Sequence, residues 1–237
     1  MGLVTQAIRL PNLALRPLGF ELQRVKSHTW QPRNSRFLYF QELVETITDV
    51  PGDIVECGVG NGKSLFWLGL LTEGGKHARR IWGFDSFEGL PPAQPEDEKA
   101  SKQAIRKVRA KKTTRSEAHL RWMILRYRLR PRRRISRRQL QQRFVFVKGL
   151  SPVTFSTYAD GPIALLHLNL HRYQAHRECL EYFEPKVADG GVVVCDRYRG
   201  FKSIGATRAV DDYYGGPPPG FRKSEHARGW FLVKRAS

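Results

Sequence analysis

The chain alternates between short apolar runs and segments whose apolar residues recur at helical spacing. From Phe37 to Ile47 these residues are three or four positions apart, which predicts a helix that begins at Asn34 or Ser35 and ends near Asp49. The same pattern predicts further helices over residues 62–73, 173–183 and 205–214. Five apolar runs have the length of buried strands, and they lie at residues 53–57, 80–85, 143–149, 163–168 and 192–196.

Strands that are separated by helices predict an α/β fold with a doubly wound, mainly parallel sheet. Residues 221–235 are expected to add a closing pair of strands, which makes seven. Ligands of such sheets bind at the carboxyl ends of the strands. Polar residues stand at or just past five of these ends, so we expect them to gather at one rim: Glu56, Asp85, Lys148, Asn169 and Asp196.

The length of 237 residues fits one domain, which we expect to span residues 35–237. An N-terminal extension, residues 1–34, precedes it, and an insertion at about 92–142 interrupts it. The extension has arginines and prolines within its apolar part, unlike a signal peptide. It is expected to pack on the domain or to touch a membrane as a surface segment. No apolar run reaches 18 residues, so no transmembrane helix is expected.

Three cysteines, Cys57, Cys179 and Cys195, lack the spacing of metal ligands. Their odd number and apolar surroundings predict buried free thiols, which fit a reducing cytoplasm better than a disulfide framework.

The net charge of +19 comes almost wholly from the insertion. Between Lys99 and Arg143 there are 18 basic residues and one acid, Glu117. Such a segment needs anions nearby to offset its self-repulsion. We expect it to face an anionic glycan or lipid-linked acceptor, an anionic membrane surface, a nucleic acid or a protein partner. Its arginines alternate with Trp122 and Tyr127, an arrangement that suits nucleic acid.

The stretch 52–64, GDIVECGVGNGKS, predicts a cofactor site, because glycines at a strand-to-helix turn let a ligand approach the backbone. Its end, Gly62-Lys63-Ser64, fits a phosphate-binding loop, but Cys57 stands where that loop needs glycine, and Glu56 is negative.

Two other cofactors remain for the stretch. A dinucleotide site needs a different glycine spacing from that of Gly58, Gly60 and Gly62. S-adenosylmethionine has a positive sulfonium and amino group and no phosphate. It suits an acid on the first strand for the methionine end, Glu56, and an acid on the second for the ribose, Asp85.

Together with this stretch, four others resemble the macrocin-type (TylF-like) O-methyltransferases: IWGFDSFEGLP, FVFVKG, LLHLNLHRYQAHRECLEYFEPKVADGGVVVCDRYRG and GATRAVDDYY. The resemblance covers roughly residues 35–91 and 143–215. It implies a Rossmann-like class I methyltransferase fold, S-adenosylmethionine as methyl donor, and a hydroxyl of a sugar, glycan or natural product as acceptor. It places Ser86 beside the cofactor pocket and the segment after Lys148-Gly149 along the adenine. The residues expected to bind the cofactor are Glu56, Gly58, Gly60, Gly62, Ser64, Asp85, Ser86, Lys148, Gly149 and Ser151.

The chain departs from this family where the family usually binds a divalent metal. Family members read L-D-x-D-L-Y where this chain has LNLHRY at residues 168–173, and D-D-Y where it has DRY at residues 196–198. Of three metal-binding carboxylates only Asp196 remains, since Asn169 and Arg197 replace the other two. Mg²⁺ usually needs carboxylates, so we do not expect a Mg²⁺ site.

Two hypotheses follow from this departure. In the first, methyl transfer is independent of metal: Arg197 supplies the metal's charge and orients the acceptor oxygen, Asp196 holds it beside Asn169, and His171 takes the hydroxyl proton. In the second, the protein binds S-adenosylmethionine without turnover or acts as a partner subunit. A nucleic-acid methyltransferase that uses the basic insertion is a further alternative, and a homo-oligomer is compatible with each.

Overall fold

The computed structural model describes residues 35–89, 91, 95–97, 142–158, 161–200, 203–227 and 229–235. The expectations for the N-terminal extension and for nearly all of the basic insertion lie outside these residues and stay predictions. Within the described ranges, no helix is both long enough and apolar enough to cross a membrane.

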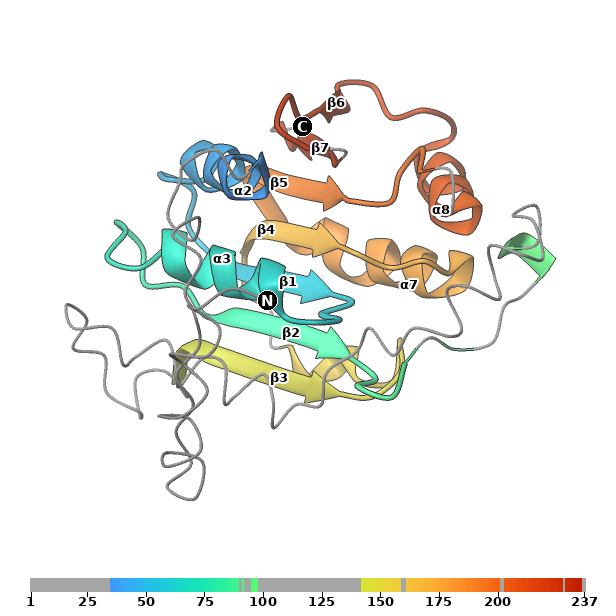
Figure 1. The fold of residues 1–237 in the computed structure, drawn as a ribbon, viewed down its shortest axis with the longest axis horizontal. Helices are drawn as coiled ribbons and strands as arrows, with labels where there is room; N and C mark the ends of the chain where they lie inside the picture. Colours follow the sequence, from blue (N-terminus) through green and yellow to red (C-terminus); the bar gives the residue numbers. More distant parts are fainter. Residues whose placement is uncertain are drawn as a thin grey trace, which may run out of the picture. The chain divides into compact units, whose positions relative to one another are not determined.

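Seven strands form one sheet in the order β3-β2-β1-β4-β5-β7-β6 (Figure 1). They are β1 (Asp53–Cys57), β2 (Ile81–Asp85), β3 (Phe144–Lys148), β4 (Ile163–Leu168), β5 (Val187–Cys195), β6 (Arg222–Lys223) and β7 (Trp230–Val233). The first five run parallel, whereas β7 is antiparallel to both of its neighbours. The predicted mainly parallel, seven-stranded α/β fold and its closing pair of strands are confirmed.

Helices cover both faces of the sheet. Alternate residues of each strand point to opposite sides, so both faces carry apolar side chains that helices bury. Ile54 and Leu165 belong to the apolar core under α2 (Ser35–Thr46) and α3 (Lys63–Leu71). Val55 and Leu166 belong to the core under the other pair of helices, α7 (Tyr173–Phe183) and α8 (Ile204–Tyr214). Three short 3₁₀ helices complete the described elements: η3 (Pro95–Asp97), η4 (Phe155–Thr157) and η5 (Glu184–Lys186). The three cysteines are buried and free, as predicted.

Strand β5 begins five residues earlier than its apolar run predicts. Gly190 and Gly191, a glycine pair of the kind that usually signals a turn, lie inside the strand. The ladder with β4 passes from the pair Ile163–Val187 to the pair Leu165–Val192, so β5 has extra residues that form a bulge. Gly190 accommodates this with a φ of 76°, in the left-handed region that favours glycine.

The carboxyl ends of the parallel strands lie level with each other, and their arrows point the same way in Figure 1. The register pairs Asp85 with Lys148, and Cys57 with both Phe84 and Leu168. The carboxyl ends of these strands therefore lie at one rim, as expected, but the side chain of Glu56 is buried and does not face that rim.

Candidate active site

The glycine turn after β1 lies against the end of β4. Gly58 has a φ of 85°, and a Cβ there would lie 2.7 Å from the carbonyl oxygen of Asn169. Gly60 also has a positive φ, of 58°, but a Cβ added to it would meet no atom within 4 Å. Gly62, at 73°, caps α3. Gly58 thus lets two backbone segments approach each other, while Gly60 leaves open space beside the turn.

Asp85, at the end of β2, ties this turn to the following loop. One carboxylate oxygen accepts a hydrogen bond from the Gly60 amide at 2.9 Å, and the other accepts one from the Phe87 amide at 2.8 Å. A carboxylate oxygen accepts more than one hydrogen bond, so both can still receive a ligand hydroxyl. Asp85 is therefore placed to bind a diol and to hold the glycine turn in shape.

The other residues expected near the cofactor lie on the loops after β2 and β3. Ser86 donates its hydroxyl to the Gly89 carbonyl at 3.0 Å, and Lys148 lies 2.9 Å from a Glu88 oxygen. The Gly149 amide donates to the Asp85 carbonyl at 3.1 Å, and Ser151 follows shortly after it. These contacts join the ends of β2 and β3.

Glu56 points away from the rim, into the layer under α2 and α3. Its side chain is fully buried. One carboxylate oxygen, Oε1, accepts a hydrogen bond from the Ser64 hydroxyl in the first turn of α3 and lies 3.2 Å from Nδ1 of His167. The other oxygen has no hydrogen-bond partner among the described residues. Glu56 thus lies beneath the glycine turn, and its Oε2 atom accepts no hydrogen bond from the described residues.

Asp196, just past the end of β5, accepts two hydrogen bonds and lies beside a buried histidine. The Tyr39 hydroxyl donates to it at 2.7 Å and the Arg36 guanidinium at 3.3 Å, while Nε2 of His167 lies 3.3 Å away. Burial would raise the pKa of Asp196, but the charge and hydrogen bond of His167 hold it well below its usual range. Asp196 is therefore ionised and oriented.

Three of these partners were not predicted as site residues: Arg36 and Tyr39 on α2, and His167 on β4. His167 interrupts an otherwise apolar run, IALLHL, and it pairs directly with Glu56 across the strands. A polar residue inside a buried strand is a signal that could have found it. The two α2 residues follow no such pattern, because only the packing of α2 brings them to Asp196.

The two residues that replace metal-binding carboxylates bind each other. Nε of Arg197 donates to the side-chain oxygen of Asn169 at 3.1 Å, and the Asn169 amide nitrogen donates to the Gly58 carbonyl at 3.2 Å. The oxygens of Asn169 and Asp196 thus already face N–H groups, and a fixed cation stands beside them. This donor set does not fit a divalent cation.

His171 lies two residues past Asn169, close to the guanidinium groups of Arg197 and Arg172. Its Nδ1 is 3.2 Å from the Ser203 hydroxyl. Burial and the charges of Arg197 and Arg172 lower the pKa of His171 from 6.5 to about 4. The imidazole is therefore neutral at neutral pH, but it is a weaker base than an ordinary histidine.

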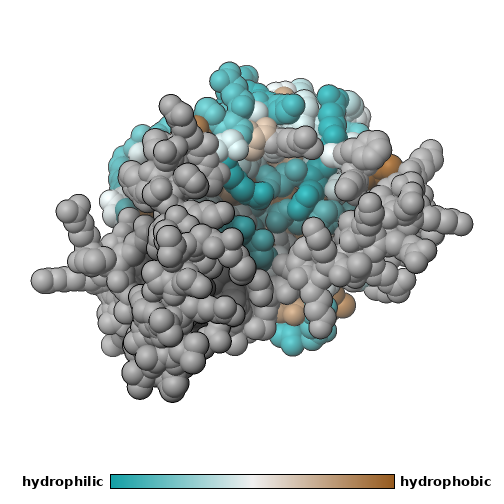
Figure 2. Space-filling view, in the orientation of Figure 1, coloured by the Kyte–Doolittle hydropathy of each residue, from teal (hydrophilic) through white to brown (hydrophobic). Residues whose placement is uncertain are grey.

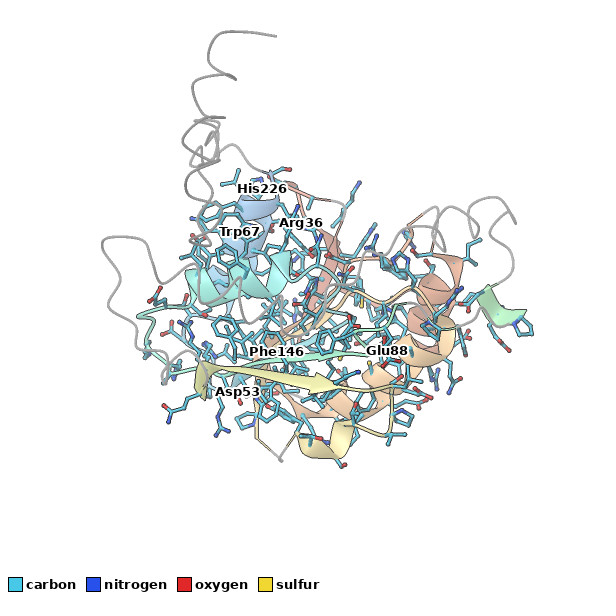
Figure 3. The ribbon with its side chains drawn as sticks, turned by 60° about the horizontal axis from the view of Figure 1, so that its bottom comes forward. Arg36, Asp53, Trp67, Glu88, Phe146 and His226 are labelled. Carbon is cyan, nitrogen blue, oxygen red and sulfur yellow. The ribbon has the colours of Figure 1, made fainter. Side chains whose placement is uncertain are left out.

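A cavity of about 820 Å³ opens beside Asp196 and Arg197. Its other walls are the start of α2 and the β6–β7 hairpin, and Figure 3 labels one residue of each, Arg36 and His226. Where the described surface is visible in Figure 2 it is mainly hydrophilic. His171 and the glycine turn are not among the residues that line this cavity, so the predicted site residues fall into two neighbouring groups: the cofactor turn, and the Asp196–Arg197 wall.

The chain is similar to methyltransferases of natural-product chemistry. A family model described as macrocin-O-methyltransferase (TylF) matches residues 27–215. Over 179 residues the chain is 31% identical to an 8-demethyl-8-(2,3-dimethoxy-alpha-L-rhamnosyl)-tetracenomycin-C 4'-O-methyltransferase of Streptomyces olivaceus. Over 176 residues it is 27% identical to a demethyldecarbamoylnovobiocin O-methyltransferase of Streptomyces niveus. These matches cover 74% and 73% of this chain, and 63% of the length of each relative.

A solved structure agrees with the fold. The calicheamicin methyltransferase CalS11 superposes with a TM-score of 0.72 at 19% sequence identity. The superposition covers 98% of this chain and 93% of that one.

Proposed function

The chain belongs to the macrocin-O-methyltransferase (TylF) family, and from this premise we propose that it methylates a hydroxyl of a sugar, glycan or natural product without a metal ion. The observation that carries the proposal is the Asn169–Arg197 pair beside the ionised Asp196, where the family's metal ligands are expected.

The glycine turn fits S-adenosylmethionine. Open space beside Gly60 allows the ligand to approach the backbone, and Asp85 has acceptor capacity for ribose hydroxyls. Glu56, buried beneath the turn, is proposed to act on the cofactor side through Ser64, whose hydroxyl donates to it. Ser86 is proposed to lie beside the cofactor pocket, and the segment after Lys148-Gly149, with Ser151, to flank the adenine. When bound, this cofactor supplies an electrophilic methyl group on a sulfonium.

On the acceptor side, the chain's own groups align the hydroxyl and manage its charge. Arg197 uses Nε for Asn169, and its terminal nitrogens have no hydrogen bond to another described residue. They are free to donate to the acceptor oxygen and to stabilise the negative charge that grows there as the methyl carbon is attacked. Asp196, fixed by Tyr39 and Arg36, holds the acceptor in place.

The hydroxyl proton is proposed to pass to His171, which lies near the Arg197 guanidinium although it does not line the cavity itself. Its Nδ1 is engaged with Ser203, and no described residue is hydrogen-bonded to Nε2. The lowered pKa means that this atom is unprotonated over the whole neutral range. Oxygen gains a methyl carbon and loses a proton, and the C–S bond electrons leave with sulfur, so the reaction balances.

The proposal predicts methyl transfer that survives chelation. The full chain is incubated with labelled S-adenosylmethionine and a panel of glycosides, with and without EDTA. We expect equal rates in both arms, and a loss on the order of a hundredfold in His171→Ala, as for removal of a general base. The matched control is His77→Ala, which changes an exposed histidine at the other edge of the sheet. Activity that EDTA abolishes, or that His171→Ala leaves intact, would contradict the mechanism.

A second candidate function is favoured by the low basicity of His171 and by the donors already bound to Asp196: a protein that binds the cofactor without turnover. Calorimetric binding of S-adenosylmethionine without methylation of any acceptor in the same panel would establish it.

We further propose that the acceptor carries an anionic group. Three cations line the cavity, Arg36, Arg197 and Lys223, against two acids, Asp196 and Glu225. The charge of Asp196 is already offset by Arg36 and by the buried His167, which leaves the wall with an excess of positive charge. Acidic and neutral glycosides in the panel separate this proposal from the general one. The membrane and nucleic-acid predictions rest mainly on Lys99–Arg143. Like the homo-oligomer prediction, they are unaffected by these observations.

A further inference from the structure

A histidine that the proposed mechanism does not use lies between two acids at the centre of the sheet. His167 on β4 is fully buried, and its ring packs edge-on to Phe40, with centroids 5.7 Å apart. Nδ1 is 3.2 Å from a Glu56 oxygen, and Nε2 is 3.3 Å from an Asp196 oxygen. One ring thus joins residues that come from β1 and from the end of β5.

This placement favours the imidazolium form. A neutral imidazole has one N–H group and one nitrogen lone pair, and that lone pair would face a lone pair of a buried carboxylate. With both nitrogens protonated, the ring instead carries a positive charge between the two carboxylates at ion-pair distance, while neither nitrogen has a hydrogen-bond partner in good geometry among the described residues. Burial alone lowers the pKa of His167, but the charges of Asp196 and Glu56 raise it to about 10. The unit Glu56–His167–Asp196 therefore carries alternating charges, and Arg36 balances the remaining negative one.

Each end of this unit reaches one of the two proposed ligand sites. At the first end, Glu56 accepts the hydroxyl of Ser64, which follows the glycine turn directly. At the other end, Asp196 accepts the Tyr39 hydroxyl at 2.7 Å and lines the cavity. A continuous chain of polar contacts therefore runs from the cofactor turn to the acceptor wall, through the interior of the sheet.

We propose that His167 is a positioning residue that couples the cofactor turn to the acceptor wall, an inference that rests on the proposed function. It touches neither ligand. Its ring forms ion pairs with Glu56 on one side and Asp196 on the other, so a shift of either carboxylate moves the ring and changes the ion pair with its counterpart. Filling one site then changes the affinity of the other.

A first test needs no ligand. Nitrogen-15 NMR follows the His167 ring in the full chain, in the parent and in two variants that each remove one end contact, Ser64→Ala and Tyr39→Phe. We expect both ring nitrogens to be protonated at neutral pH, and each variant to lower the pKa of His167. Thr48→Ala, which changes an exposed hydroxyl on the turn after α2, is the control. A His167 that titrates near 6.5, or that responds to neither variant, overturns the proposal.

A second test measures the coupling. Calorimetry gives the dissociation constant of S-adenosylmethionine for the parent, Tyr39→Phe, His167→Gln and their combination. Tyr39 is at the acceptor end, so its loss should weaken cofactor binding about threefold to tenfold in the parent and less than twofold beside His167→Gln. If His167→Gln does not fold, the cycle of Ser64→Ala with Tyr39→Phe gives the same information.

The outcomes separate the two proposals. The coupling is overturned if Tyr39→Phe changes the dissociation constant of S-adenosylmethionine by the same factor in the parent and in His167→Gln, or changes it in neither. This holds even where methylation proceeds. A parent that does not bind S-adenosylmethionine refutes the proposed function instead, and the NMR titration still decides the role of His167.

Discussion

Asn169 and Arg197 replace two carboxylates with a pair of side chains that satisfy each other. The Arg197 guanidinium donates to the amide oxygen at 3.1 Å, so neither residue offers a free oxygen to a metal. A departure from the family pattern was visible in the sequence, but its consequence depended on whether the two residues touch. In the proposed mechanism, their contact puts a fixed cation where the family resemblance implies a metal.

Restoring both carboxylates should restore metal binding. Asn169→Asp with Arg197→Asp places three carboxylates, with Asp196, at adjacent strand ends, and carboxylates are the ligands Mg²⁺ prefers. We expect calorimetry to detect Mg²⁺ binding to the double variant and none to the parent. Arg199→Ala, an exposed arginine two residues further on, is the control for the loss of a local positive charge. Equal Mg²⁺ affinity in parent and double variant would contradict our interpretation of the pair.

Asp85 allows a test of the cofactor turn. In Asp85→Asn the new NH₂ group faces a backbone N–H from Gly60 or Phe87, so one hydrogen bond is lost. The dissociation constant of S-adenosylmethionine should rise about tenfold to a hundredfold. Asp53→Asn is the matched control, because Asp53 accepts comparable bonds from Arg80 and Trp82 but stands at the start of β1, whereas Asp85 stands at the end of β2. The Asp85 assignment fails if the two variants bind the cofactor equally well.

Single residues were predictable where a strand end or a glycine fixed their place. Asp85 and Asp196 could be placed at the rim because parallel strands end at one edge. Arg36 and Tyr39 could not, since the angle at which α2 packs decides what its first turns contact. Glu56 was expected at the ligand surface, but the alternation of β1 directs its side chain into the layer under α2 and α3.

Elements were predicted more completely than residues. The helical and strand periodicities predicted the succession of strands and helices along the chain, because each element needs an apolar face that packs against another element. The start of β5 was missed, since a glycine pair signals a turn and a bulge alike. Which of the two forms depends on the partner strand, β4, which the local sequence does not reveal.

The packing of α3 on the sheet depends on a glycine within the helix. A Cβ on Gly69 would overlap the ring of Phe144 on β3. Gly69→Ala should therefore lower the free energy of unfolding by about 1–3 kcal/mol, as overpacking usually does, although alanine favours helix. Urea denaturation measures this, and Gly69→Ala with Phe144→Leu should recover part of the loss. A more stable single variant would show that helix propensity outweighs the clash.

For the whole molecule, three histidines predict a stability maximum near pH 6.5. The pKa of His167 is raised to about 10, so its contribution is complete below 6.5 and is lost as the pH rises toward 10. Burial lowers the pKa of His176 to about 4, and that of His171 is also lowered to about 4. Their contributions are present above 6.5 and are lost as the pH falls toward 4.

Denaturant titrations at pH 5, 7 and 9 check this prediction. The alkaline decline should be smaller in His167→Gln, and the acid decline smaller in His176→Leu. A curve that falls steadily in one direction across this range would show that other groups dominate.

A guanidinium in place of a metal also changes what the molecule can recognise in an acceptor. A divalent cation binds oxygen ligands from many directions, and two neighbouring hydroxyls can chelate it at once. A guanidinium donates only in its own plane and along fixed N–H directions. With Nε of Arg197 held by Asn169, that plane is set before the acceptor arrives. We therefore expect the position of methylation to be chosen by the direction of one hydroxyl, so that an acceptor without a vicinal diol is as suitable as one that has it.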